Sequence, residues 1–239
     1  MALPYKDQEG NKKKQVEQMF DSISPKYDFL NHLLSGGIDI YWRKRAIKEL
    51  KNQPIDLLLD MATGTGDFAI EALKLNPKKI IGMDISDGML SFGRKKIKEM
   101  NIGDKIEFIQ ADSEKIPLED NSVDAITVSF GVRNFENLSL GLKELNRVLK
   151  PNGKCVIVEF SNPKKFPMKQ LYWFYAKKIL PIFGKLISGD PSAYTYLPES
   201  VAEFPDGQNF LSIYEKAGFI QVKCITMTGG ICSIYTGTK

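Results

Sequence analysis

Short apolar runs alternate along this chain with longer stretches of helical period. This alternation is typical of a parallel sheet with helices on both faces, because each parallel strand needs a crossover before the next. The predicted strands of this kind are Ile55–Asp60, Lys79–Asp84, Lys105–Gln110, Asp124–Ser129 and Lys154–Phe160. The predicted helices between them are Asp67–Leu75, Ser86–Met100 and Leu138–Leu149.

The alternation of strands and helices stops near the end of the chain. Phe219–Met227 and Ile231–Thr238 are strand-like runs joined through Gly229 and Gly230, which favours a hairpin. Such a hairpin attaches antiparallel strands to an otherwise parallel sheet. The predicted fold class is therefore α/β, with a mainly parallel sheet of seven strands and an antiparallel C-terminal hairpin.

The length of 239 residues suits one domain with one large core. Within it we distinguish a helical N-terminal lid (1–50), a core that binds the cofactor (51–165), an aromatic insertion that forms the substrate pocket (166–205), and a C-terminal helix with the hairpin (206–239).

Charge and cysteine usage narrow the class of protein. The 33 basic and 29 acidic residues are interspersed, and a net charge of +4 is too small to indicate nucleic-acid binding. The three cysteines form no CxxC pair, the N-terminus has no apolar signal segment, and no run approaches the roughly 18 apolar residues of a membrane span. We therefore expect a cytoplasmic protein without a metal site.

A strand, a glycine turn and the start of a helix follow one another from Leu57 to Ala69. Gly64 and Gly66 permit backbone conformations and a close ligand approach that a Cβ atom would block. Twenty residues after Gly64, Asp84 ends the second strand, where a carboxylate can hold the two hydroxyls of a ribose. The same spacing also fits a dinucleotide fingerprint.

The acids beside the turn separate these two ligands. Asp60 and Asp67 would repel the pyrophosphate of a dinucleotide. S-adenosylmethionine (SAM) has no phosphate and carries a sulfonium and an ammonium group, which carboxylates attract. The charges therefore favour SAM.

Two further strand ends open onto the same crevice, because the carboxyl ends of parallel strands meet at one edge. Asp112, after the third strand, is placed to accept a hydrogen bond from an adenine amino group. Residues Ser129–Asn134, after the fourth strand, bring polar groups beside the centre of this edge.

Several segments together resemble the class I SAM-dependent methyltransferases, and within them the UbiE/MenG family of demethylmenaquinone and ubiquinone-precursor C-methyltransferases. The segments are Tyr27–Asn31 with Leu34, Ser35 and Trp42, then Thr63–Asp67, Ser129–Asn134, and Arg147–Gly153 leading to Glu159–Ser161. The chain departs from the family pattern at Leu30, at Asn152 and at Asp39, which stands where the family has histidine.

The resemblance implies a Rossmann-like fold and SAM contacts from Thr65, Asp84, Asp112, Ser113 and Ser129. It also implies methylation of a prenylated quinol, with S-adenosylhomocysteine (SAH) as the second product. The reaction it favours converts demethylmenaquinol to menaquinol. A benzoquinol precursor of ubiquinone, or another small molecule, is the alternative.

A neutral aromatic carbon is a poor nucleophile, so this reaction needs a base and close alignment. We expect Arg133 and Asn134, helped by Asp67, to polarise a water or the quinol oxygen and to stabilise the phenolate. The alternative for Arg133 is a pair with a nearby acid that closes the loop after the fourth strand. His32, the only histidine, is either a helix-surface residue or part of the substrate pocket.

The insertion is unusually apolar for a surface segment. It suits the wall of an isoprenoid channel, a homodimer face, a shallow contact with the inner face of the cell membrane, or ordinary core. The residues concerned are Leu171–Tyr175, Ile179, Leu180, Ile182, Phe183, Leu186 and Ile187. The N-terminal region is expected to cover the cofactor, and its lysines to favour anionic lipid.

Three other classes of protein are alternatives. An RNA or protein methyltransferase would show a concentrated basic face or a proline-aromatic loop after the fourth strand, where this chain has Ser129–Asn134. A regulator that binds SAM without transferring its methyl group, and a dehydrogenase, share the glycine turn. Transfer of a labelled methyl group from SAM would distinguish an enzyme from such a regulator. Comparison of NADH binding with SAM binding would distinguish a dehydrogenase from a methyltransferase.

Overall fold

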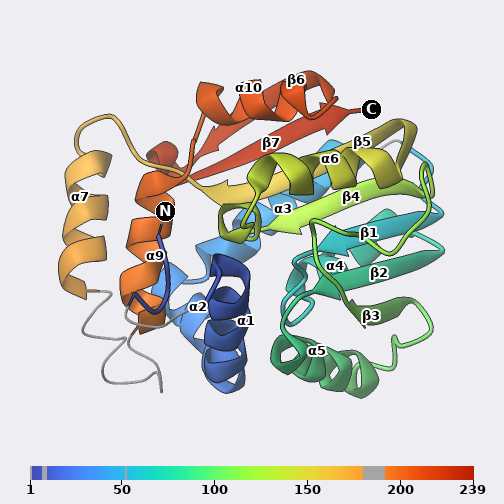
Figure 1. Ribbon diagram of the computed structural model, residues 1–239, viewed down its shortest axis with the longest axis horizontal. Coiled ribbons are helices and arrows are strands. Elements are labelled where there is room, and N and C mark those ends of the chain that lie inside the picture. The colour runs from blue at the N-terminus through green and yellow to red at the C-terminus, as the bar shows by residue number, and fades with distance from the viewer. Residues whose placement is uncertain (1, 7–9, 52, 180–191) are drawn as a thin grey trace.

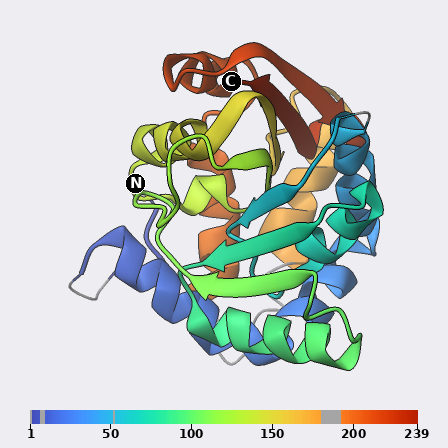
Figure 2. The same ribbon diagram turned by 90° about the vertical axis from the view of Figure 1, so that its right-hand side faces the viewer.

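The computed structural model describes residues 2–6, 10–51, 53–179 and 192–239. These residues form one seven-stranded sheet between layers of helices (Figure 1), and the strands fan out with a marked twist when the molecule is turned (Figure 2). The strands are β1 Leu57–Met61, β2 Lys79–Asp84, β3 Ile106–Gln110, β4 Val123–Ser129, β5 Leu149–Phe160, β6 Ile220–Met227 and β7 Cys232–Thr238.

The strand order is β3-β2-β1-β4-β5-β7-β6. Strands β1 to β5 pair in parallel, whereas β7 pairs antiparallel with both β5 and β6. The predicted mainly parallel sheet with an antiparallel C-terminal hairpin is thus confirmed. The order reverses between β1 and β4, which is the switch point where open α/β sheets bind ligands.

The fifth strand begins earlier than predicted. It was expected from Lys154, but β5 begins at Leu149, directly after the preceding helix ends at Val148, so the turn residues Pro151 and Gly153 lie within the strand. The register explains this: Val123 pairs with Leu149, while Ala125, two residues on, pairs with Lys154. The turn residues form a bulge inside the pairing of β4 with β5, which turn chemistry alone does not reveal.

Each face of the sheet has its own helices and its own apolar cluster. Packed on one face are α3 (Ile38–Ile47), α4 (Asp67–Ala72) and α5 (Asp87–Glu99), and on the other α6 (Leu138–Val148) and α10 (Gln208–Lys216). These clusters bury both faces of the central strands, which is why those strands are almost uniformly apolar.

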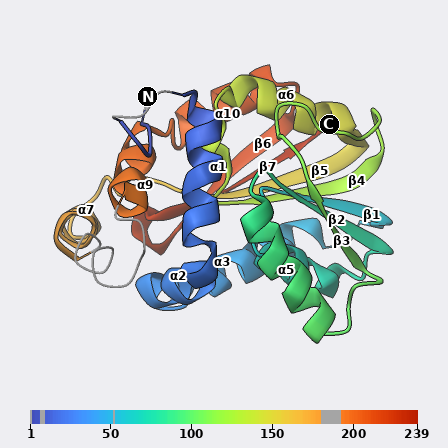
Figure 3. The same cartoon turned by 60° about the horizontal axis from the view of Figure 1, so that its bottom comes forward.

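A third group of helices gathers beyond the carboxyl ends of the parallel strands, with α1 running between α9 and α5 (Figure 3). It comprises α1 (Lys12–Ile23), α2 (Tyr27–Ser35), α7 (Met168–Phe174), a π-helical turn (Tyr175–Ile179) and α9 (Ser192–Glu203). Short 3-10 turns lie at Ser24–Lys26, Lys48–Leu50, Leu73–Leu75, Val132–Asn134 and Thr228–Gly230. The group has its own apolar cluster, which includes Met19, Ile23, Met89, Ala176 and Tyr196.

Within the described residues, no helix combines the length and apolar character needed to cross a membrane. Part of the apolar insertion, namely Leu180, Ile182, Phe183, Leu186 and Ile187, lies outside the described residues.

Candidate active site

Two neighbouring cavities lie at the carboxyl edge of the sheet. Their volumes are about 460 Å³ and about 70 Å³. The residues that line both are Phe20, Tyr27, Ala62, Gly64, Ser129 and Phe130. The lid helices therefore cover a two-part site centred on the loops after β1 and β4.

Those two loops pack tightly against each other. Ala62 and Phe130 both adopt left-handed backbone conformations, with φ of 54° and 57°. A Cβ atom on Gly131 would lie 2.4 Å from the Cβ of Ala62, so this approach requires glycine. Left-handed conformations at residues other than glycine cost free energy and gather at functional sites, which agrees with the position of the cavities.

The two glycines of the turn after β1 have different surroundings. Gly64 has φ of 57° and lines both cavities, and a Cβ there would meet only the ring of Tyr27, at 3.9 Å. Gly66 has φ of 87°, and a Cβ there would lie 2.4 Å from the ring of Phe108. Gly66 lines neither cavity, so it allows Phe108 to pack beneath the turn. A direct cofactor contact from Gly66 stays a prediction.

Asp60 lies fully buried beneath the same turn. Its carboxylate accepts hydrogen bonds from the hydroxyls of Thr63 and Thr127, each at 2.6 Å. Burial raises the pKa of Asp60 to about 6, against these hydrogen bonds, which favour the charged form. The carboxylate ties the turn to β4 and lines neither cavity, so the predicted attraction of a cationic cofactor by Asp60 stays a prediction.

Asp84 ends β2 and lines the smaller cavity. Its carboxylate accepts hydrogen bonds from the backbone N–H of Gly64 at 2.8 Å and of Ser86 at 3.0 Å. Burial raises the pKa of Asp84, and the backbone donors act against that rise. Each carboxylate oxygen has a second lone pair, so the group can still accept from ligand hydroxyls.

Asp112 and Ser113 line the other end of the smaller cavity. Lys13 of α1 donates to Asp112 at 2.7 Å and to Glu114 at 3.0 Å. The lid therefore supplies a cation to the carboxylate that was predicted to face the adenine ring, a contact that the sequence did not reveal.

The hydroxyl of Ser129 lies where the two cavities meet. Its Oγ atom is buried and finds no hydrogen-bond partner within the described residues. A buried polar atom without a partner is costly and calls for an explanation. Ser129 lines both cavities, so this position faces the space that a ligand would enter.

Aromatic rings form one wall of the larger cavity. Phe130 and Phe160 lie 4.5 Å apart between ring centroids, at 31°, and Trp42 packs against both at 6.0 and 6.1 Å. The indole N–H of Trp42 donates to Thr228 at 2.8 Å, which fixes the ring. This wall offers a flat apolar surface beside the strand ends.

Arg133 lines the same cavity and is paired. Its Nη1 lies 2.8 Å from Oε1 of Glu159, which is fully buried, and its guanidinium lies 5.4 Å from the centroid of the Phe160 ring. Nη1 also donates to the carbonyl of Phe130, whereas the buried Nε has no partner within the described residues. Burial raises the pKa of Glu159, and Arg133 opposes this rise. Arg133 therefore forms the ion pair with a nearby acid that was expected as the alternative to a catalytic role. It also lines the larger cavity, so the two roles are compatible.

Asn134 lines the smaller cavity, and its amide is already engaged. Its Nδ2 donates to the carbonyl of Phe130 at 3.3 Å, and its Oδ1 accepts from the hydroxyl of Tyr196 at 3.0 Å. Asn134 thus connects the loop after β4 with α9.

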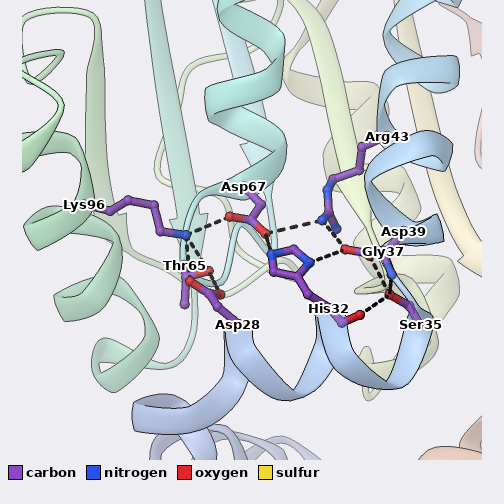
Figure 4. Close-up of polar contacts among 9 residues, drawn as sticks. All are labelled: Asp28, His32, Ser35, Gly37, Asp39, Arg43, Thr65, Asp67 and Lys96. Atoms are coloured by element: carbon purple, nitrogen blue, oxygen red, sulfur yellow. Dashed lines mark hydrogen bonds and ion pairs between the residues drawn. The ribbon is translucent and has the colours of Figure 1, made fainter.

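Asp67 begins α4 and also lines the larger cavity. Its oxygens lie 2.7 Å from Nζ of Lys96, 3.3 Å from Nη2 of Arg43 and 3.5 Å from Nε2 of His32 (Figure 4). Burial alone would raise the pKa of Asp67, but Lys96 and Arg43 lower it below its usual value. Thr65, predicted to contact SAM, joins this group, because its hydroxyl donates to Asp28 at 2.5 Å.

The helix α1 is tied to the loops after three strands. Besides the contact of Lys13 with Asp112, Nζ of Lys12 donates to the carbonyls of Arg133 and Phe135 at 2.8 and 3.1 Å, and burial lowers the pKa of Lys12. Asp21 accepts from the hydroxyl of Ser86 at 2.6 Å. These contacts agree with the expected lid.

The predicted residues thus divide into four groups. Around the smaller cavity lie Asp84, Asp112, Ser113 and Asn134; around the larger lie Thr65, Asp67 and Arg133; and Gly64 and Ser129 face both. Asp60 and Gly66 support the turn from below. Sequence reasoning did not identify the charged residues that pair with these predicted residues, because no local sequence pattern indicates a contact between distant elements. They are Glu159, Arg43, Lys96 and Lys13.

Comparison with known proteins agrees with this geometry. The ubiE/COQ5 methyltransferase family matches residues 8–239 of the chain. A protein of Bacteroides fragilis named demethylmenaquinone methyltransferase is 49% identical over 237 residues, which are 99% of this chain and 96% of that protein. A ubiquinone/menaquinone biosynthesis C-methyltransferase UbiE of Geotalea uraniireducens is 44% identical over 230 residues, covering 95% and 97%.

Solved structures share the fold at low identity. A SAM-dependent methyltransferase from Aquifex aeolicus superposes with a TM-score of 0.60 at 22% identity, covering 82% of this chain and 88% of that one. A phosphoethanolamine N-methyltransferase 2 of Haemonchus contortus, in complex with S-adenosylhomocysteine, gives 0.61 at 14% identity, covering 82% and 52%.

Proposed function

The chain belongs to the ubiE/COQ5 methyltransferase family, and from this premise we propose that it methylates a ring carbon of demethylmenaquinol to give menaquinol. The relative of 49% identity that carries the corresponding name supports this substrate over a benzoquinol precursor. The observation that carries the proposal is the adjacency of the two cavities: one has the polar groups for SAM, and the other is a larger aromatic chamber that meets it at Ser129.

The residues of the smaller cavity fit SAM. Asp84 offers free lone pairs to the ribose hydroxyls, Asp112 and Ser113 suit the adenine end, and the main chain at Gly64 is open to the methionyl part. The unpartnered hydroxyl of Ser129 gives a hydrogen bond at the junction. When bound, SAM supplies the methyl group as part of a sulfonium and leaves as SAH.

The larger cavity suits a quinol ring. The aromatic wall of Trp42, Phe130 and Phe160 provides stacking surface for a flat ring, and Arg133 next to it is a permanent cation. Removal of the quinol hydroxyl proton pushes electron density onto the ring carbon, so a cation that stabilises the resulting phenolate favours methylation.

We assign different roles to the three residues expected to act in catalysis. Arg133 stabilises the developing phenolate charge. Asn134 holds the carbonyl of Phe130 and the hydroxyl of Tyr196, so it positions the wall of the cavity. Asp67 lines the cavity as a carboxylate, so it accepts the proton of the quinol.

The prenyl tail of such a substrate needs an apolar exit. Four exposed apolar side chains lie on the helices beside the larger cavity, with exposed fractions from 46% to 62%. We call them the apolar rim: Phe29 and Leu33 of α2, and Leu171 and Phe174 of α7. The hydroxyl of Tyr175 donates to the carbonyl of Leu34 at 2.7 Å, which joins the two sides of the rim.

The rim supports a peripheral contact with a lipid bilayer, where a prenylated quinol resides. Lys177 and Lys178 are exposed directly after α7, so the apolar side chains are accompanied by cations that attract anionic headgroups. Through this contact the substrate would pass from the bilayer to the cavity with its tail kept away from water.

The test of the function is methyl transfer itself. Purified protein, SAM labelled in the methyl group and a short-tailed demethylmenaquinol should give a labelled product with one added methyl group by mass spectrometry. A benzoquinol of the same tail length serves as competitor and should react more slowly. Faster methylation of the benzoquinol would instead support a role in ubiquinone biosynthesis. Binding of SAH without any methyl transfer would indicate a regulator.

A further inference from the structure

Charged side chains from four helices meet beside the larger cavity, below the glycine turn. They are Asp28 and His32 of α2, Asp39 and Arg43 of α3, Asp67 of α4, and Lys96 of α5 (Figure 4). Three carboxylates thus face one guanidinium, one ammonium and one imidazole. The group is balanced in charge only when His32 carries a proton.

His32 lies between two of these carboxylates. Its Nδ1 is 3.0 Å from Oδ2 of Asp39, and its Nε2 is 3.5 Å from Oδ2 of Asp67. Only the contact with Asp39 is short enough for a hydrogen bond, so we place the hydrogen of the neutral imidazole on Nδ1, which turns the lone pair of Nε2 toward Asp67. The imidazole is therefore oriented to receive a proton from Asp67.

The imidazole also stands between the cavity and solvent. Asp39 and Asp67 line the cavity, with side-chain exposures of 6% and 26%, whereas His32 is not part of the lining and its side chain is 36% exposed. Among the described residues, a path from the cavity through Asp67 thus reaches water at His32.

The proposed reaction needs such a path, and the following inference rests on that proposal. Replacing a ring hydrogen by a methyl group from a sulfonium releases one proton per turnover. First the O–H bond of the quinol breaks, its electron pair stays in the ring system, and the ring carbon forms the new bond to the methyl group as the carbon–sulfur bond breaks. The C–H bond of that carbon then breaks, and its electron pair restores the aromatic ring. The phenolate oxygen takes back one of the two protons to give the quinol product, so one proton per turnover remains to be removed.

Asp67 on its own is a poor final holder of that proton. Lys96 and Arg43 lower the pKa of Asp67, and a weakly basic carboxylate returns a proton readily unless another group removes it. Histidine is the side chain that gains and loses a proton most easily near neutral pH.

We propose that His32 is the proton exit of this site: it takes the proton from Asp67 on Nε2 and releases it to water, while Asp39 orients the ring through Nδ1. His32 acts through Asp67 and does not touch the substrate, so it is a positioning and relay residue. Arg43 keeps both carboxylates in place, since its Nη2 contacts Asp39 and Asp67.

The main test compares His32→Gln with Ser35→Ala. Glutamine can still donate a hydrogen bond to Asp39 but cannot carry a proton. Ser35→Ala removes a different hydrogen bond to Asp39, of 2.5 Å, and reports what loosening the lid does by itself. We expect His32→Gln to lower kcat about 10- to 100-fold, with the dissociation constant of SAH within about twofold of wild type. The pH profile of Ser35→Ala should keep its wild-type shape.

A second measurement covers the case in which the glutamine variant folds poorly. In His32→Ala, added imidazole should restore part of the lost turnover, as the side chain it replaces is accessible to solvent. In the wild type, the single histidine gives one imidazole Cε1–H signal by NMR, and its change with pH should follow the change of kcat with pH.

Three outcomes would overturn the inference. They are wild-type kcat in His32→Gln, a loss of turnover equal to that of Ser35→Ala, and a loss that imidazole does not restore. The wild-type reaction with demethylmenaquinol is measured first. If wild type transfers no methyl group, both the proposed function and this inference fail. If wild type and His32→Gln are equally active, the function stands and only this inference fails.

Discussion

Arg133 and Glu159 form an ion pair across the ends of β4 and β5, with 2.8 Å between Nη1 and Oε1 and side-chain exposures of 7% and 0%. Removing one partner of such a buried pair leaves the other charge without compensation. We therefore expect Arg133→Ala to lower the free energy of unfolding by about 3–5 kcal/mol at pH 8. The loss should shrink at pH 5, because Glu159 can then bind a proton. Urea unfolding at both pH values measures this, and a loss below 1 kcal/mol at pH 8 would contradict it.

The same pair separates a structural from a catalytic role of Arg133. The double variant Arg133→Met, Glu159→Gln removes both charges together, so it should be more stable than Arg133→Ala. If Arg133 stabilises the phenolate, the folded double variant should still bind SAH with wild-type affinity and lose about 100- to 1,000-fold in kcat. Wild-type kcat in the double variant would remove Arg133 from the mechanism.

Asp84 is predicted to hold the ribose. Asp84→Asn removes the negative charge and replaces one of the two oxygens that accept from the N–H groups of Gly64 and Ser86 by an amide NH₂ group, which cannot accept. We expect the affinity for SAH to fall about 10- to 100-fold by calorimetry, since hydrogen bonds to charged groups contribute about 1.5–3 kcal/mol. Asp87→Asn is the matched control, because Asp87 pairs with Arg94 at the surface. Equal effects of the two substitutions would argue against the ribose contact.

The two glycines of the turn should respond differently to alanine. In Gly64→Ala the methyl group enters open space that both cavities share, so we expect a loss of about 1–2 kcal/mol in stability and a clear loss of SAH affinity. In Gly66→Ala the methyl group collides with Phe108, so the stability loss should be larger, about 2–4 kcal/mol. Phe108→Leu should partly restore the stability of Gly66→Ala and leave Gly64→Ala unaffected.

The outline of the site could be predicted because it depends on strand ends. Asp84, Asp112 and Ser129 follow consecutive apolar runs, and parallel strands bring such positions to one edge whatever the details of packing. The glycine turn also indicated a left-handed backbone conformation and an open main chain at Gly64. Both signals are local in sequence, so one chain was enough to predict which strand ends line the smaller cavity.

The partners could not be predicted because they depend on register and on turns between helices. Glu159 meets Arg133 because Ser129 pairs with Val158, a register that composition does not determine. His32 meets Asp39 because two left-handed glycines, Gly36 and Gly37, fold α3 back on α2.

Asp60 should give the stability of the protein a distinct pH dependence. Burial raises its pKa from 3.8 to about 6, so the folded state binds a proton here that the unfolded state has lost. The stability that this proton contributes is complete well below the unfolded pKa of 3.8 and disappears as pH rises through 6. At 1.36 kcal/mol per pKa unit the whole contribution is about 3 kcal/mol, of which about 2.4 kcal/mol is lost between pH 4 and pH 7.

Asp60→Asn removes this titration while keeping the size of the side chain. The free energy of unfolding of wild type, minus that of the variant, should therefore fall by about 2.4 kcal/mol from pH 4 to pH 7. Denaturant titrations across this range measure the difference, with Asp87→Asn as a surface control. Parallel curves for wild type and Asp60→Asn would show that burial does not control this carboxyl.

The apolar rim should decide whether the protein binds bilayers. Burial of a phenylalanine side chain contributes about 1.5–3 kcal/mol, so Phe29→Glu with Phe174→Glu, which line neither cavity, should reduce binding to phosphatidylglycerol vesicles at least tenfold in a sedimentation assay. Binding of wild type should weaken at high salt and with phosphatidylcholine, because Lys177 and Lys178 attract anionic headgroups. Ile220→Glu is the control, since Ile220 is 55% exposed on the edge strand β6, away from the rim.

The outcome also separates a lipid contact from a homodimer that uses the same surface. If the rim docks on lipid, the glutamate variant should retain turnover of a water-soluble quinol with no tail, while losing turnover of a long-tailed quinol held in vesicles. If the rim joins two copies of the chain, ultracentrifugation of wild type without lipid should give a dimer that the variant loses, and the vesicle assay should not distinguish the two proteins. The two surfaces give different results for a physical reason. A bilayer contact affects turnover only when the substrate must be taken from the bilayer, whereas a subunit interface stabilises the enzyme with every substrate.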